Sequence, residues 1–222
     1  MPPKIENPVI SFVMPIKDRV HLIAEVLDSI FKQTIHDWEL IIVNDNSTDD
    51  LKDLLPFYAA DERIGYINLE KSVGVATARN IGNSLGRSKY IGVVDSDDLY
   101  APERARLSIE GLKKYDLLFG SYYVADSRGV PIELIEAEEI DWKRFKKEHY
   151  TAGGFTLAYK RNKVLQTPYQ WGLRFDEDRQ LILDFKKKGY KIGFTKEVLG
   201  KMRLQREGLS MTRGKVLNVK RS

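Results

Sequence analysis

The sequence predicts an α/β protein with a mostly parallel central sheet, flanking helices and a small antiparallel addition. Residues 9–114 alternate β-rich runs with amphipathic runs four times, which is typical of a parallel sheet with covering helices. After this half the alternation stops, and two β-rich runs, 117–125 and 130–135, flank a polar turn. The 222 residues, 42% hydrophobic and 31% charged, suffice for one domain with a real core.

The elements of the first half follow from local patterns. A strand over 9–16, closed by Pro15, precedes a helix over 19–33 whose apolar residues share one face: Ile23, Val26, Leu27, Ile30 and Phe31. A second strand covers 38–43. Ser47 to Asp50 is typical of a helix N-cap, so we expect a helix that buries Leu51, Leu54, Leu55 and Tyr58.

Two further strands complete this half. After a strand over 64–69, the small residues from Val73 to Gly82 predict a helix packed closely against another element. A fourth strand ends at Val94, and Pro102 marks the start of the next helix. The strand ends near residues 17, 45, 72 and 96 should open on the same sheet edge.

The second half is less regular. Residues 136–149 predict a surface helix or loop, and a strand over 155–159 follows Gly153 and Gly154. A helix with Leu181, Ile182 and Phe185 on one face should end at Gly189. A last strand over 191–195 should lead into a basic segment.

The feature that organises the chain is the end of the fourth strand, where Asp95, Asp97 and Asp98 fall within four residues. Neighbouring carboxylates repel each other unless a cation lies between them. Mg²⁺ or Mn²⁺, which prefers oxygen ligands and also grips a diphosphate, would supply that cation. A solvated acidic turn is the alternative interpretation.

Composition excludes several classes of site. The chain has no cysteine, which rules out disulfides and thiolate chemistry, and its three histidines make a histidine-based zinc centre a poor fit. The net charge of +4, gathered in runs such as 143–147 and 186–188, suits phosphate-bearing ligands or an anionic membrane surface, although solvated faces explain most such runs. We expect no nucleic-acid partner.

Targeting signals are not evident. Residues 1–8 lack the layout of a signal peptide, and no run approaches the ~20 apolar residues that span a bilayer. We therefore expect a cytoplasmic protein that at most contacts a membrane peripherally.

The order of motifs from about Val9 to Ser210 resembles the family 2 glycosyltransferases, which are inverting, nucleotide-sugar-dependent enzymes with a GT-A fold. Five blocks carry the resemblance: Val13–Arg19, Trp38–Asp49 preceded by Gln33-Thr34, Gly74–Asn80, the Asp-x-Asp of Asp95–Asp98, and Phe175–Asp178. The resemblance implies one glycosyltransferase domain over 1–222. Its donor-binding half covers about 9–114, its acceptor-binding half about 115–210, and its basic tail 211–222.

The resemblance also implies roles on the donor side. Asp45 would accept a hydrogen bond from the nucleotide base, such as from the imide N–H of uracil in a UDP-sugar. It can also cap a turn. Arg79 would reach the nucleotide or its phosphates; the alternative is a packed, ion-paired helix residue. Asp95 would meet the ribose or the metal, and Asp97 would bind Mn²⁺ or Mg²⁺ directly. Three more residues fall in donor-binding motifs: Pro15, Lys17 and Ser96.

On the acceptor side, the resemblance makes Asp178 the general base, with Glu177 as the second candidate. Trp171 could stack on an acceptor sugar or pack in the core. The chemistry agrees, because inverting transfer is one in-line displacement that needs a base opposite the leaving group and positive charge on the diphosphate. It needs no protein nucleophile.

The sequence departs from the family pattern at three places. Lys17 and Asp18 stand where Tyr and Asn are usual, and Gln205 stands in the place of a histidine near the metal. Arg203 or Arg206 could neutralise the diphosphate instead.

Two other classes compete with the transferase interpretation. A catalytically impaired nucleotide-sugar-binding module is one. A nucleotidyltransferase is the other, but residues 15–20 lack its Gly- and Arg-rich phosphate loop. The acceptor would be a saccharide, free or linked to lipid or protein, in polysaccharide or glycoconjugate synthesis. The sugar, the acceptor and the oligomeric state are not specified by the sequence.

Overall fold

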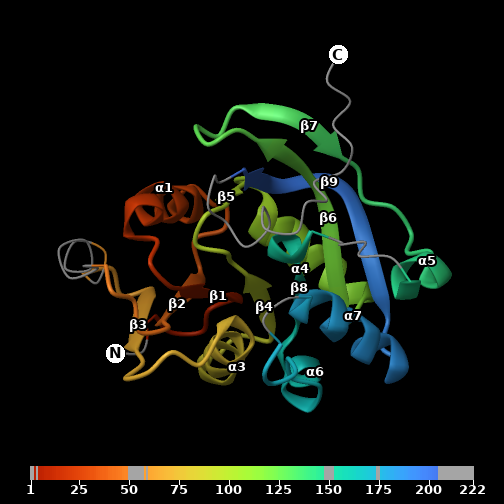
Figure 1. Cartoon of the computed structure of the whole chain (residues 1–222), viewed down its shortest axis with the longest axis horizontal. Coiled ribbons are helices and arrows are strands. Elements are labelled where there is room, and N and C mark those ends of the chain that lie inside the picture. Colours follow the sequence, from red (N-terminus) through yellow and green to blue (C-terminus); the bar gives the residue numbers. More distant parts are fainter. Residues whose placement is uncertain are drawn as a thin grey trace.

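A computed structural model describes residues 3, 5–49, 58, 60–147, 153–173 and 176–204 of the chain (Figure 1). Within these residues, nine strands form one sheet in the order β3-β2-β1-β4-β8-β6-β9-β5, with β7 paired to β6. Parallel and antiparallel pairs both occur in it, with helices on its faces. The predicted α/β fold class is therefore confirmed.

Except for β5, which pairs antiparallel with β9, the strands of the first half form a parallel part of the sheet. Its elements are β1 (Ile10–Ile16), α1 (Val20–Phe31), β2 (Trp38–Asn44), β3 (Ile64–Asn68), α3 (Val75–Leu85), β4 (Tyr90–Val93), β5 (Leu99–Tyr100) and α4 (Arg104–Lys114). The pairs β1–β2, β2–β3 and β1–β4 are all parallel, as the alternation of strands and helices predicts. Figure 1 shows α1 and α3 on opposite sides of β1 and β2.

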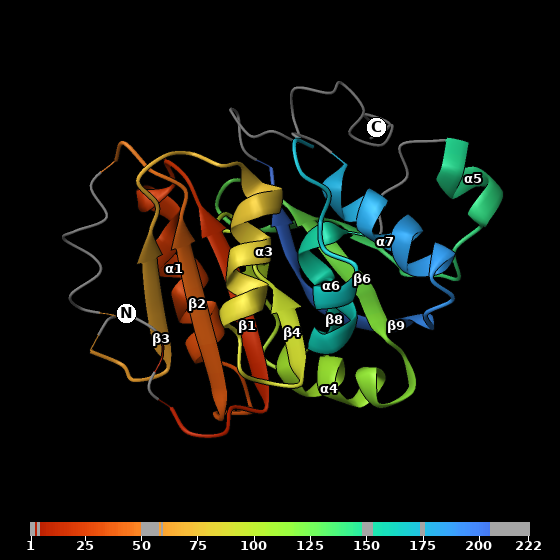
Figure 2. The same cartoon turned by 90° about the horizontal axis from the view of Figure 1, so that it is seen from below.

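The second half supplies the antiparallel strands. Its elements are β6 (Leu117–Ala125), β7 (Pro131–Ile135), α5 (Trp142–Lys147), the 3₁₀ turn η1 (Gly154–Thr156), β8 (Ala158–Lys160), α6 (Arg161–Gln166), α7 (Glu177–Lys187) and β9 (Ile192–Arg203). Strand β8 lies between β4 and β6 and is antiparallel to both, whereas β6 and β9 are parallel. Figure 2 shows α3, α6 and α7 together on one face of the sheet.

Three predicted boundaries are wrong. Pro15 lies inside β1, where it is tolerated because the pairing of β1 with β4 stops at Val13 and no ladder bond requires its missing N–H. The strand predicted over 155–159 is mostly the turn η1, with β8 following it. The last strand does not end at Thr195 but continues to Arg203, because it pairs with the whole length of β6.

Close packing of α3 is confirmed. A Cβ atom at Gly82 would lie 2.3 Å from Cγ1 of Val13 in β1, so only glycine lets the helix approach the strand this closely. The helix predicted to bury Leu51, Leu54 and Leu55 lies outside the described residues. Asp49, expected to begin that helix, accepts a hydrogen bond from the backbone N–H of Val20 at the start of α1 (2.7 Å).

The core is divided by the sheet. One cluster joins Phe12, Met14 and Ile16 of β1 to α1 and α4. A second joins Val13 to Leu181, Ile182 and Phe185 of α7, the three residues predicted for its buried face, and a smaller third cluster lies around Ile41 and Val43 of β2. The core therefore packs against α7, and the first turn of this helix lies at the sheet edge where β1, β2 and β4 end.

No helix among the described residues has the length and apolarity needed to cross a membrane.

Candidate active site

The first part of the site lies where β2 ends. Asp45 is 4% exposed, and its carboxylate accepts hydrogen bonds from Ser72 Oγ (2.8 Å) and from the backbone N–H groups of Val73 (2.6 Å) and Gly74 (3.0 Å). These bonds hold the chain at the entry to α3, where Gly74 has a φ of +84°. Lys17 Nζ donates to the same Ser72 hydroxyl (2.7 Å). The turn-capping role of Asp45 is thus seen, and its role toward a nucleotide base stays a prediction.

The second part is the loop that follows β4, residues 94–98. Its backbone is fixed at both ends: the N–H of Val94 donates to Val13 O (2.9 Å), and the N–H of Asp98 lies 3.5 Å from Asp95 O. Arg203, at the end of β9, binds this loop twice. Its backbone N–H donates a hydrogen bond to Asp98 Oδ1 (3.0 Å), and its side-chain Nε donates one to Asp97 O (2.7 Å). The predicted carboxylate cluster is therefore an ordered turn.

The carboxylates of this loop share an environment that favours a cation. Burial, followed by the charge of Asp95, raises the pKa of Asp97, and the nearest counter-charge is Arg19 Nε at 3.9 Å. Burial and the charge of Asp97 hold the pKa of Asp98 well above its usual range. No group of three or more His, Asp or Glu side chains within the described ranges forms a complete metal cage. One or two carboxylates plus substrate phosphates are, however, a usual set of ligands for Mg²⁺, so Asp95 and Asp97 fit such an ion.

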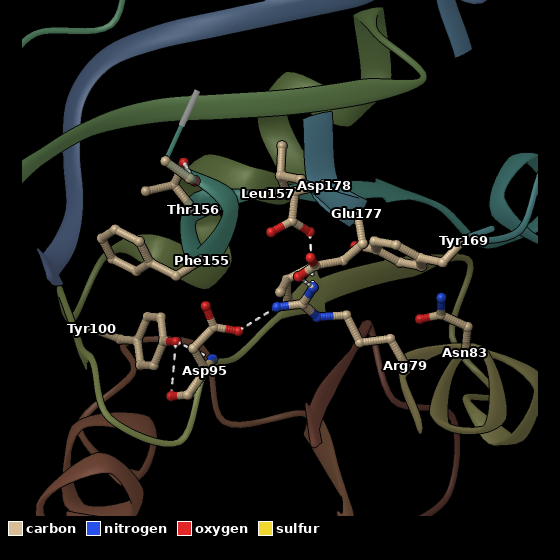
Figure 3. Close-up of polar contacts among 12 residues, drawn as sticks. Arg79, Asn83, Asp95, Tyr100, Phe155, Thr156, Leu157, Tyr169, Glu177 and Asp178 are labelled. Atoms are coloured by element: carbon tan, nitrogen blue, oxygen red, sulfur yellow. Dashed lines mark hydrogen bonds and ion pairs between the residues drawn. The ribbon is translucent and has the colours of Figure 1, made fainter. Parts of the chain in front are cut away.

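Arg79 connects this loop to α7 (Figure 3). Its side chain is 3% exposed, and its guanidinium meets Asp95 Oδ1 (2.6 Å), Glu177 Oε1 (2.7 Å) and Asp178 Oδ1 (3.0 Å). Burial alone would lower the pKa of Arg79, but the charges of Asp178 and Asp95 hold it well above its usual value. The packed, ion-paired interpretation of Arg79 is therefore observed, and contact with a nucleotide stays a prediction.

The carboxyl group of Asp178, beside Arg79, has a perturbed pKa. Burial raises its pKa to about 7, against the lowering effect of Arg79 and with the charges of Glu177 and Asp95 adding to the increase. It lies in the first turn of α7, where the helix dipole favours a carboxylate. A Cβ at Gly154 in the turn η1 would lie 2.0 Å from Asp178 Oδ2, so the backbone of this turn closes over the carboxylate.

The remaining predicted residues differ in exposure, and some of them lie outside the described residues. Trp171 is 80% exposed, so the core-packing alternative for it is wrong. Arg203 is 2% exposed, and its Nη1 also meets Glu25 Oε2 (2.5 Å). Ser96 is buried in the loop, and Pro15 is part of β1. Outside the described residues lie Phe175, Gln205 and Arg206.

Sequence reasoning did not identify four residues of the site: Tyr100, Arg104, Gly154 and Tyr169. Tyr169 is fully buried with its ring 5.4 Å from the guanidinium of Arg79. Tyr100 and Arg104 lie beneath the carboxylate loop. None belongs to a motif in the sequence; only their proximity to Asp95 and Asp178 in the fold reveals them.

Comparison with known proteins shows the family to which the chain belongs. A family model described as glycosyl transferase family 2 matches residues 11–176, so the chain belongs to that family. An uncharacterized glycosyltransferase of Rickettsia bellii is 31% identical over 140 residues, which are 62% of this chain but only 20% of the relative. The chain thus spans about a fifth of that relative's length.

Two further comparisons cover more of the chain. The Escherichia coli UDP-Glc:alpha-D-GlcNAc-diphosphoundecaprenol beta-1,3-glucosyltransferase WfgD is 24% identical over 220 residues, 96% of this chain and 84% of the relative. The solved structure of the mannosyltransferase PcManGT from Pyrobaculum calidifontis, in complex with GDP-Man and Mn²⁺, has a TM-score of 0.70 at 16% identity and covers 96% of this chain and 62% of that one. The likeness to such structures confirms the GT-A fold.

Proposed function

We propose that this chain catalyses the inverting transfer of a sugar from a nucleoside diphosphate sugar to a hydroxyl group of an acceptor. The observation that carries the proposal is the position of Asp178. It is a half-buried carboxyl group, 21% exposed, with its pKa raised to about 7, and it is joined through Arg79 to the carboxylate loop after β4. A general base works best when its pKa lies near the operating pH, and this environment supplies such a base next to a diphosphate-binding edge.

On the donor side, we propose that residues of about 9–114 bind the nucleotide, with Asp45, Lys17 and Pro15 near the base. A UDP-sugar is the favoured donor because the Asp45 carboxylate can accept a hydrogen bond from the imide N–H of uracil. The relative WfgD is also named for UDP-Glc. The structural neighbour PcManGT was solved with GDP-Man, so the base is the part of the donor that experiment must decide.

Asp97 and Asp95 would hold a divalent cation, Mn²⁺ or Mg²⁺. When bound, the cation would neutralise charge on the departing diphosphate. Arg203, whose Nη2 is buried without a hydrogen-bond partner among the described residues, is a second source of positive charge beside Asp97. Gln205 and Arg206 follow Arg203 in the sequence, and we propose them near the metal and the diphosphate, respectively.

The base step follows from the protein groups alone. The carboxylate of Asp178 takes the proton of the acceptor hydroxyl as the acceptor oxygen bonds to the anomeric carbon. The bond from that carbon to the diphosphate oxygen breaks in the same step, and the configuration inverts. Arg79 fixes the orientation of the Asp178 carboxylate through its 3.0 Å contact, and Glu177 is the alternative base held by the same guanidinium at 2.7 Å.

The acceptor would bind beside α7, in the half of the chain that covers about 115–210. The exposed indole of Trp171 offers an apolar face on which a sugar ring can stack. A saccharide acceptor, free or linked to lipid or protein, in polysaccharide or glycoconjugate synthesis is consistent with WfgD, whose name describes a lipid-diphosphate-linked acceptor.

The test is calorimetric binding of UDP, GDP, TDP and CDP, each with Mn²⁺ and again with EDTA. We expect UDP to bind best, with an affinity that depends on the metal and falls in Asp97→Asn. The matched control is Asp141→Asn, on the separate segment that begins α5. Binding of no nucleotide by the wild type would refute the proposal. Undiminished binding in EDTA would assign the diphosphate charge to Arg203 instead of the metal.

A further inference from the structure

One hydroxyl group holds the backbone of Asp95, the first carboxylate residue of the carboxylate loop. Tyr100, in β5, is 5% exposed, and its Oη accepts a hydrogen bond from the N–H of Asp95 at 2.6 Å. The same hydroxyl lies 3.3 Å from Asp95 O, to which it can donate. Figure 3 shows the Tyr100 ring directed at the Asp95 backbone from the side opposite Arg79.

This hydroxyl replaces a missing strand partner. β4 ends at Val93, and after it the backbone N–H of Val94 still donates a hydrogen bond to Val13 O of β1. The N–H of Asp95 therefore takes its partner from a side chain, in a part-buried hydrogen bond. A donor shielded from water without a partner is costly. The Asp95 carboxylate, fixed by this backbone, meets Arg79 at 2.6 Å.

Tyr100 is itself held by a buried cation. The guanidinium of Arg104 lies 4.2 Å from the centre of the Tyr100 ring, and Arg104 is fully buried. Its Nη2 donates to Val93 O at the end of β4 and, across the site, to Phe155 O (2.8 Å) and Leu157 O (3.4 Å). Arg104 thus connects the strand before the carboxylate loop with the η1 turn that closes over Asp178.

The buried positive charge of Arg104 lies close to the carboxylate loop. Among the described residues, Arg104 forms no ion pair with a carboxylate. Burying an unpaired charge is unfavourable, and burial lowers the pKa of Arg104. The carboxylates of Asp95 and Asp98, in the loop above, act in the opposite direction without cancelling this effect.

We propose that Tyr100 and Arg104 are positioning residues of the donor site. Tyr100 sets the backbone of Asp95, and with it the direction of the carboxylate that meets Arg79 and the donor. Arg104 holds Tyr100 and keeps the carboxylate loop in register with the η1 turn beside Asp178. This inference rests on the proposed function, because it assigns a role in binding the donor with its metal.

The decisive variant is Tyr100→Phe, which keeps the ring and its contact with Arg104 and removes only the hydroxyl. Tyr90→Phe is the matched control, since it makes the same change at the other end of β4. Hydrogen exchange of the Asp95 amide, followed by NMR, reports the positioning directly. We expect exchange at least about tenfold faster in Tyr100→Phe and unchanged in Tyr90→Phe.

Binding of UDP with Mn²⁺, measured by calorimetry, reports the consequence for the site. We expect the Kd to rise about 10–100-fold in Tyr100→Phe, as is common when groups that orient metal ligands are lost, and to stay within about twofold in Tyr90→Phe. Unchanged Asp95 exchange in Tyr100→Phe, or faster exchange with an unchanged Kd, would overturn the proposal.

Arg104 is tested by a pair of variants. Lys at this position keeps a positive charge and hydrogen-bond donors, whereas Met keeps only an unbranched apolar side chain. We expect the Kd for UDP with Mn²⁺ to increase in the order wild type, Arg104→Lys, Arg104→Met, and equal effects of the two variants would refute a role for the charge. If the wild type binds no nucleotide, the proposed function fails. The Asp95 exchange rates then still decide whether Tyr100 positions the loop.

Discussion

Replacing Gly154 with alanine should act first on the proposed base, because the new Cβ would collide with the Asp178 carboxylate. The new Cβ would lie 2.0 Å from Asp178 Oδ2 and 2.7 Å from Asp178 Cγ, whereas ordinary contacts begin at 3.4 Å, so the two groups must separate by about 1.4 Å. A displacement of about 1 Å at a reacting group can cost about 100-fold in rate. We therefore expect kcat of Gly154→Ala to fall about 100-fold while the Kd for UDP with Mn²⁺ stays within about threefold.

The assay is release of nucleoside diphosphate from the donor under saturating conditions, beside calorimetric binding. Gly111→Ala is the matched control, because its Cβ would come within 2.5 Å of Leu118 Cδ2, a similar collision in α4 that involves an apolar side chain. We expect this control to change stability but not kcat. A Gly154→Ala variant with wild-type kcat would show that the position of the Asp178 carboxylate does not limit the reaction.

The other predictions concern the same cluster. Because the pKa of Asp178 is raised to about 7, kcat/KM should fall about tenfold per pH unit well below pH 7 and level off above it, and a flat profile from pH 5 to 8 would contradict a base at this position. The folded-state pKa lies above the ordinary value of 3.8, so the folded chain binds the proton more tightly than the unfolded chain, and stability is lost as pH rises from about 4 to 7. Asp178→Asn removes this penalty, and its Tm relative to wild type should therefore be higher at pH 8 than at pH 4; a pH-independent difference would refute the shift. Arg79→Met leaves three carboxylates without their buried counter-charge and should cost about 3–5 kcal/mol in urea unfolding, whereas Arg106→Met, at an exposed pair, should cost less than about 1 kcal/mol. Equal losses in these two variants would argue against a buried cluster.

The parallel half of the fold could be predicted from the sequence because its signals are local. Each strand there is a short apolar run, and each following helix repeats its apolar residues on one face, as Ile23, Val26 and Leu27 do in α1. The length of β9 could not be predicted in this way. Its residues Lys196, Glu197 and Lys201 read as a polar segment, and only pairing with β6 makes them a strand.

The candidate site could be predicted in part for the same reason. Asp45, Asp95 and Asp178 follow strands or begin a helix within motifs of fixed order, so their types and places are visible in the chain. Contacts between distant segments are not visible. Arg79 reaches residues 16 and 99 positions away in the sequence, and the hydroxyl of Tyr100 has a partner only because the loop folds back over β5.

The central claim is that Asp178 is the base of a glycosyl transfer that starts from a nucleoside diphosphate sugar. The most direct test is release of nucleoside diphosphate from UDP-sugars by wild type, Asp178→Asn and Glu177→Gln, with donor affinity measured on the same samples. We expect Asp178→Asn to bind the donor as wild type does and to lose about 10²–10⁴-fold in kcat, and Glu177→Gln to lose far less. Wild-type turnover by Asp178→Asn, with the loss found in Glu177→Gln instead, would contradict the assignment.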